Sequence, residues 1–147
     1  MAADKKFAGY LCTGCGIGER LDTRQLIQIA TREGKMAACK EHSMLCSAEG
    51  VQLIRDDIAA GNATHIMIAA CSRRAKVEAF SFPEVAMSRA NLREGVIWLR
   101  PEGDEHQETT QEMADDYVRM ACAEVRFMTQ PSGSGEQPLN RTLMVVG

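Results

Sequence analysis

The chain has 147 residues, of which 45% are hydrophobic and 25% charged, and its net charge at pH 7 is −3. This composition is typical of one globular domain that can bury a core without disulfide bonds. The Lys and Arg residues are scattered, and the chain has one Trp and two Tyr. Because nucleic-acid-binding proteins use basic patches and base-stacking aromatic residues, we expect no nucleic acid partner.

No membrane insertion is expected either. The amino terminus lacks an apolar signal core, and the longest apolar run, Ile66 to Cys71, is too short to cross a bilayer. We therefore expect a cytoplasmic protein. In that reducing compartment, the six cysteines of the chain are more often metal ligands or redox groups than disulfides.

The first half of the chain alternates between strand and helix patterns. In chain order we expect a strand at 7–12, a helix from 22 to 34, a weaker strand at 35–39, a helix from 47 to 61 and a strand at 64–71. Asp22 followed by Gln25 forms a capping-box pattern, and Ser47 is a suitable N-cap for the second helix. The strand at 64–71 is almost continuously apolar, as in parallel strands that are covered on both faces.

The second half continues the alternation. We expect a helix capped by Ser72 that ends near Phe80, a strand at 85–90, a short helix at 93–99, a solvated acidic loop at 101–109 and a final helix at 111–128. Alternating strands and helices imply right-handed βαβ units. The predicted fold class is therefore α/β, a small three-layer parallel sheet of about four strands flanked by helices, Rossmann-like or flavodoxin-like.

The carboxyl-terminal segment differs in composition from the rest. Residues 131–138 are rich in Pro, Ser and Gly, which is typical of a linker, and residues 141–147 form an apolar stretch that stops at Gly147. We expect a domain at 1–130, a linker at 131–140 and, at 141–147, the first strand of a following domain. Such a strand ending in Gly could open a dinucleotide-binding turn, so the chain is expected to be a fragment of a longer protein.

Four cysteines lie at junctions of the predicted elements. Cys12 and Cys15 follow the first strand in Cys-Thr-Gly-Cys, Cys46 precedes the helix at 47–61, and Cys71 ends the apolar strand. Because functional groups gather at the carboxyl edge of a parallel sheet, these thiols are expected to converge on a soft-metal or iron–sulfur site. A helix amino terminus after Cys46 and after Cys71 would favour their thiolate forms. Redox-active thiols and inert buried cysteines remain alternatives.

The other cysteines have simpler interpretations. Cys39 lies in a predicted strand beside small apolar residues and is expected to be buried, with a reserve role as a ligand. Cys122 is expected to pack in the last helix. His42 and His65 have no partner at ligand spacing, and His106 falls in the acidic segment.

Four segments in order resemble the amino-terminal domain of the heterodisulfide reductase A-type protein (HdrA) and related flavin-containing subunits of electron-transfer and electron-bifurcating complexes. They are Gly9-Tyr-Leu-Cys-Thr-Gly-Cys-Gly, Met44-Leu-Cys-Ser-Ala-Glu-Gly-Val-Gln, Ile68-Ala-Ala-Cys-Ser-Arg-Arg and Ser88-Arg-Ala-Asn-Leu-Arg-Glu. The resemblance runs from about residue 7 to residue 128. It implies a [4Fe-4S] cluster held by Cys12, Cys15, Cys46 and Cys71, and a downstream FAD domain.

Two positions depart from the family pattern. The family usually has Cys-x-Cys-Gly in the first motif, whereas one more residue separates Cys12 from Cys15, so Cys39 could replace one of them. Arg73 stands where the family usually has Pro, which should matter little to ligation.

The resemblance implies an electron-transfer domain, which passes single electrons between the flavin of the missing domain and other subunits of a complex. The full-length protein is expected to be an FAD- and iron–sulfur-containing oxidoreductase subunit that could form a homodimer, while this part has no catalytic residues of its own. The alternative is a structural zinc domain that docks subunits, because four thiolates also suit Zn²⁺. A thiol–disulfide relay through Cys12 and Cys15 would require that pair at the start of a helix, where glycines are found instead.

Overall fold

The computed structural model describes residues 4–130 and 142–146. Its centre is a four-stranded sheet with the order β2-β1-β3-β4, in which every neighbouring pair is parallel. The strands are β1 (Phe7–Cys12), β2 (Ala38–His42), β3 (His65–Ala70) and β4 (Ala86–Asn91). This arrangement confirms the predicted α/β class with a parallel sheet.

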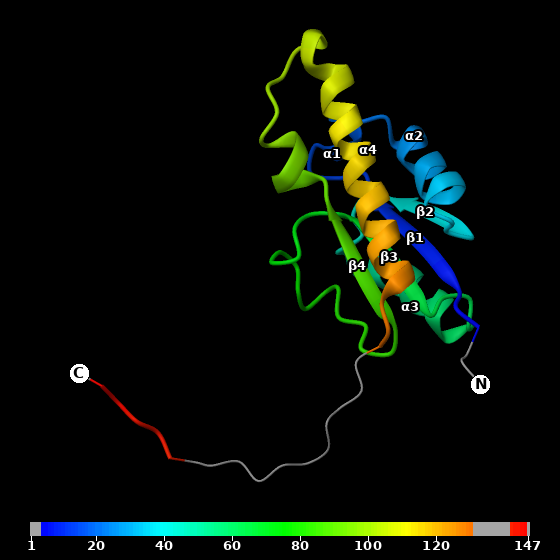
Figure 1. Cartoon of the computed structure of the whole chain (residues 1–147), viewed down its shortest axis with the longest axis vertical. Helices are drawn as coiled ribbons and strands as arrows, with labels where there is room; N and C mark the ends of the chain where they lie inside the picture. The colour runs from blue at the N-terminus through cyan, green and yellow to red at the C-terminus, as the bar shows by residue number, and fades with distance from the viewer. Residues whose placement is uncertain (1–3, 131–141, 147) are drawn as a thin grey trace.

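Helices cover both faces of the sheet. They are α1 (Ile17–Arg20), α2 (Thr23–Gln28), the π-helix η1 (Ile29–Glu33), α3 (Ala48–Ala59), the π-helix η2 (Arg93–Ile97) and α4 (Asp104–Phe127). Figure 1 shows α4 crossing in front of β3 and β4, with α2 beside it and α3 on the far side of the sheet. None of the helices in the described part of the chain is long and apolar enough to pass through a bilayer.

The sheet divides the core into two layers, because successive side chains of a strand point to opposite faces. Leu11 of β1 and Met67 of β3 pack with Val118 of α4 on one face. Tyr10 and its neighbours on the other face pack with Ile54 of α3. The last residue of β1, Cys12, belongs to this second layer.

Both predicted helix caps of the first half are confirmed. The Asp22 side chain accepts a hydrogen bond from the Gln25 backbone N–H at 3.1 Å, and the Ser47 hydroxyl accepts one from Gly50 N–H at 3.1 Å. Each bond satisfies a backbone donor that has no partner inside the helix. These local signals therefore placed α2 and α3 correctly.

The predicted helix after Ser72 is wrong. Residues 72–80 form turns and bends, because long-range contacts fix their backbone in another conformation. The Ser72 N–H donates to the Glu94 carboxylate at 2.8 Å, and Arg89 donates to the carbonyl oxygens of Cys71 and Ala75 at 2.9 Å each.

Two other element boundaries also differ. The expected acidic loop is largely helical, since α4 begins at Asp104 and not at 111; Asp104 and Glu105 lie in its first turn, where the helix dipole favours negative charge. The second strand starts at Ala38, after Lys35 takes a positive φ of 61°. The predicted linker at 131–140 lies outside the described residues, and residues 142–146 are exposed without regular secondary structure.

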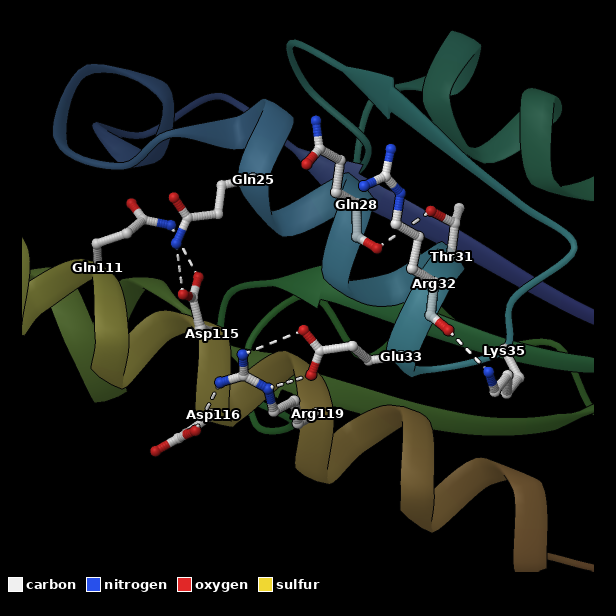
Figure 2. Close-up of polar contacts among 10 residues, drawn as sticks. All are labelled: Gln25, Gln28, Thr31, Arg32, Glu33, Lys35, Gln111, Asp115, Asp116 and Arg119. Atoms are coloured by element: carbon white, nitrogen blue, oxygen red, sulfur yellow. Dashed lines mark hydrogen bonds and ion pairs between the residues drawn. The ribbon is translucent and has the colours of Figure 1, made fainter.

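Polar contacts hold α4 against α2 and η1. The buried Asp115 carboxylate accepts hydrogen bonds from the side-chain amides of Gln25 at 2.6 Å and Gln111 at 2.9 Å. Closer to solvent, Arg119 of α4 pairs with Glu33 at 2.7 Å. Figure 2 shows both groups of contacts on the same side of α4.

Candidate functional site

The four cysteines at the predicted junctions line one pocket at the carboxyl edge of the sheet. Cys12, Cys15, Cys46 and Cys71 share this pocket with apolar side chains that include Ile17 and Phe80. Cys12 and Cys71 are each 8% exposed, Cys46 is half-buried and Cys15 is exposed. The structure therefore brings together the thiols that the sequence singled out.

The loop after β1 turns sharply to present Cys15. A Cβ atom on Gly14 would lie 2.2 Å from the Ser43 carbonyl oxygen, so only glycine fits this close approach. Cys15 and Gly16 both have positive φ angles, 56° and 86°, and the chain then enters α1. The sequence missed this helical turn, which begins at Ile17, so the Cys-x-x-Cys pair does precede a short helix.

Cys46 and Cys71 differ in what surrounds them. Cys46 directly precedes Ser47, the N-cap of α3, as predicted. Cys71 has no helix after it, so the expected contribution of a helix amino terminus is absent there. Instead, the buried Arg89 of β4 donates from Nη2 to the Cys71 Sγ at 3.1 Å.

Another arginine, Arg93, lines the cysteine pocket itself. The Arg93 guanidinium donates to Glu94 Oε1 at 2.8 Å and lies over the Trp98 ring with its centre 5.0 Å from the centroid. The hydrogen bond with Glu94 raises the pKa of Arg93, and a hydrogen bond with Cys15 acts in the same direction. The pocket thus combines thiols with the cationic side chains of Arg93 and Lys76. Arg89 lines a different pocket but reaches the Cys71 sulfur.

Cys39 and Cys122 lie elsewhere. Cys39 packs in the core layer with α4, on the face of the sheet opposite to Cys12, and its Sγ lies 3.0 Å from where a Gly9 Cβ would be. Cys122 is fully buried in the same layer, consistent with its predicted packing role. Burial raises the pKa of each of these two thiols to about 12, which disfavours the thiolate that binds metals.

The thiols do not meet at one point. Among residues 4–130 and 142–146, no group of three or more His, Cys, Asp or Glu side chains is placed to hold a single metal ion. Two of the histidines have other contacts: His42 Nδ1 accepts from the Met44 N–H at 3.0 Å, and His65 Nε2 lies 3.2 Å from the Met128 carbonyl oxygen.

Unsatisfied donors are found on the two arginines that contact the cysteines. The buried Nε groups of Arg89 and Arg93 are without hydrogen-bond partners within the described part of the chain. Sequence reasoning missed both arginines and Glu94 as site residues. A charged residue at position 89, between Ser88 and Ala90 in a strand next to an almost entirely apolar one, was the available signal.

Comparison with known proteins gives one consistent similarity. No family model matches the chain. It is 28% identical over 146 aligned positions to the A-type protein of the ferredoxin:CoB-CoM heterodisulfide reductase of Methanosarcina mazei, and the alignment covers 94% of this chain and 18% of that protein. An iron-sulfur A-type protein of the CoB–CoM heterodisulfide reductase of Methanopyrus kandleri is 26% identical over 94% of this chain.

A third relative extends the same pattern. The A-type protein of the H2:CoB-CoM heterodisulfide,ferredoxin reductase of Methanothermobacter marburgensis is 26% identical over 98% of the chain. The chain spans between 18% and 22% of the length of these relatives. It is therefore similar, along nearly its whole length, to one region of the A-type proteins of heterodisulfide reductases.

Proposed function

We propose that this chain is an electron-transfer region that holds a [4Fe-4S] cluster through Cys12, Cys15, Cys46 and Cys71. The observation that carries the proposal is that these four thiols line one pocket at the carboxyl edge of the sheet. Four cysteine thiolates are the usual ligand set of such a cluster. Thiolates are also the soft ligands that iron–sulfur clusters select over carboxylates.

One similar protein is named as an iron-sulfur component, which favours a cluster over a single ion. A tetrahedral zinc site needs four sulfurs about 2.3 Å from one point, and the described side chains contain no such group. A cubane cluster binds each thiolate through a different iron, so its ligands lie further apart. The structural zinc domain therefore remains the second candidate, with less support.

The cluster would supply one-electron redox chemistry, and the residues of the chain would define its surroundings. Ile17 and Phe80 would exclude water from the buried side, where Cys12 and Cys71 are located. The exposed Cys15 would mark the side on which an electron enters or leaves. Burial and hydrogen bonds to sulfur would set the reduction potential.

The similar proteins suggest a setting for this activity. Each is named as the A-type component of a heterodisulfide reductase, and one is named as an iron-sulfur component. We propose that the chain relays electrons between an FAD domain elsewhere in its full-length protein and other subunits of a complex. Homodimerisation of the full-length protein would be compatible with this role.

The deciding experiment is anaerobic purification followed by metal and sulfide analysis. We expect a brown protein with a broad absorption band in the region of about 400 nm and about four irons and four sulfides per chain. A colourless protein that contains one tightly bound zinc and no sulfide would instead establish the zinc alternative.

A further inference from the structure

Arg89 is an arginine buried inside the fold, with 7% of its surface exposed. Its Nη2 donates to both the carbonyl oxygen of Cys71, at 2.9 Å, and the Cys71 Sγ, at 3.1 Å. Its Nη1 donates to the Ala75 carbonyl oxygen at 2.9 Å, and its guanidinium lies 4.5 Å from the centroid of the Phe80 ring. These contacts hold the guanidinium next to Cys71, one of the predicted cluster ligands.

The charge of Arg89 is not balanced by a carboxylate. No ion pair joins Arg89 to an Asp or Glu among the described residues, although five other Lys and Arg side chains have such pairs. Glu94 is close enough to act on Arg89 electrostatically, but its two oxygens bind Arg93 and the Ser72 N–H. A buried cation without an anionic partner is unfavourable, so an anion at the Cys71 sulfur would complete the arrangement.

We propose that Arg89 is a positioning residue that orients the Cys71 thiolate and raises the reduction potential of the cluster. The inference rests on the proposed function, since it needs the cluster at Cys71. Reduction adds one electron, from a reduced flavin or from dithionite, and makes the cluster more negative by one charge. The guanidinium remains protonated throughout, so a fixed cation stabilises the reduced state more than the oxidised state.

The experiment compares Arg89→Gln, Arg89→Lys and Arg55→Gln in the same chain after anaerobic reconstitution. Arg55 is the matched control, because it also stacks on a phenylalanine, Phe82, at 5.6 Å, but lines a different pocket. The readouts are iron content, the midpoint potential from dithionite titration followed by electron paramagnetic resonance, and the Fe–S stretching bands in H2O and D2O. Arg89→Gln should give a more negative midpoint and lose the deuterium shift that an N–H···S bond produces, while Arg89→Lys should retain part of both effects.

A loaded Arg89→Gln protein with the midpoint potential and deuterium shift of the wild type would overturn the inference and leave the proposed function intact. A wild-type chain that takes up no iron and sulfide would overturn both. If Arg89→Gln loses the cluster, Arg89→Lys decides: an altered midpoint supports the proposal, and an unaltered one refutes it. If both Arg89 variants lose the cluster, the melting temperatures of their apo forms decide. Melting at the temperature of apo Arg55→Gln would support the positioning role, whereas unfolding of both apo forms would show that Arg89 serves folding alone.

Discussion

At the scale of single residues, the cysteines separate into two environments that give a direct test. Cys46 and Cys71 each provide the only thiol at their junction and line the pocket, while Cys122 is buried between α4 and the sheet. We expect Cys46→Ser and Cys71→Ser to reduce the iron content from about four atoms per chain to a small fraction of that amount, because a serine oxygen is a poor ligand for a soft cluster. Iron and sulfide analysis after reconstitution measures this.

Cys122→Ser is the control for the ligand variants and should keep its full iron content. Cys39→Ser belongs in the same series, because its environment on the other face of the sheet predicts that it is not needed. Iron retained in Cys71→Ser but lost in Cys122→Ser would show that the cluster site is misplaced.

Asp57 of α3 forms hydrogen bonds with residues of two strands, and these bonds should make the stability of the fold depend on pH. Its carboxylate accepts hydrogen bonds from Lys40 Nζ at 2.8 Å and from the Tyr10 hydroxyl at 2.9 Å. Burial opposes the charged form, but these hydrogen bonds outweigh it and hold the pKa of Asp57 below its usual value of 3.8. The stabilisation is therefore complete above the unfolded-state pKa and is lost as the pH falls through the lower folded-state pKa.

We expect Asp57→Asn to lower the free energy of unfolding by about 1.5–3 kcal/mol at pH 7, the range for hydrogen bonds to a charged group. The difference from wild type should shrink as the pH falls below about 4, because protonation of the wild-type carboxylate then removes the charge that the asparagine already lacks. Urea unfolding of the apo protein between pH 3 and pH 7, at roughly unit intervals, measures it. Asp56→Asn, next along α3 and exposed, is the control; an equal loss in both variants would contradict the role of Asp57.

At the scale of elements, the attachment of α4 depends on buried rather than exposed polar contacts. Asp115→Ala should destabilise the fold by about 1–3 kcal/mol, because the Gln25 amide loses its acceptor and the buried Gln111 amide keeps only the Asp22 carbonyl oxygen at 3.4 Å. Arg119→Ala removes the pair with Glu33, which solvent screens, and should have a much smaller effect. Thermal melting of the two variants compares them, and a larger loss in Arg119→Ala would contradict this ranking.

The accuracy of the element predictions follows the range of the interactions that fix each element. The boundaries of β1 and the caps of α2 and α3 depend on residues close in sequence, such as Asp22 with Gln25, so the sequence alone was sufficient. Ser72 has the same local pattern as Ser47, but its N–H binds Glu94, 22 positions away. No local pattern contains that contact, and the predicted helix was therefore wrong.

The same reasoning explains which residues of the candidate site could be predicted from the sequence. The four pocket cysteines were predictable because parallel strands bring their carboxyl ends to one edge, which is a property of the topology. Arg89 was not predictable, because its role depends on the irregular path of residues 72–80 around its guanidinium. Cys39 also required the structure, because its register opposite Gly9 and its packing in the layer with α4 separate it from the pocket.

At the scale of the whole molecule, the question is whether this region works alone. It spans 18% of the length of its relative in Methanosarcina mazei, and its carboxyl sheet edge, where α/β proteins place ligands, is occupied by the cysteine pocket. A cluster at that edge can store and pass one electron, but binding and turnover of a substrate require further groups. The proposal therefore makes this region a relay whose redox partners lie in other domains or subunits.

We accordingly expect the isolated chain to purify without FAD, and to neither oxidise NADH nor reduce a disulfide in steady-state assays. Reduction by dithionite should give the paramagnetic signal of a cluster that has accepted one electron, because the four thiolates keep the cubane intact in both redox states. The signal should integrate to about one spin per four irons, and reoxidation should remove it without loss of iron. Stoichiometric FAD in the purified chain, or sustained turnover of a soluble substrate, would refute the relay role and would place a catalytic site within this region.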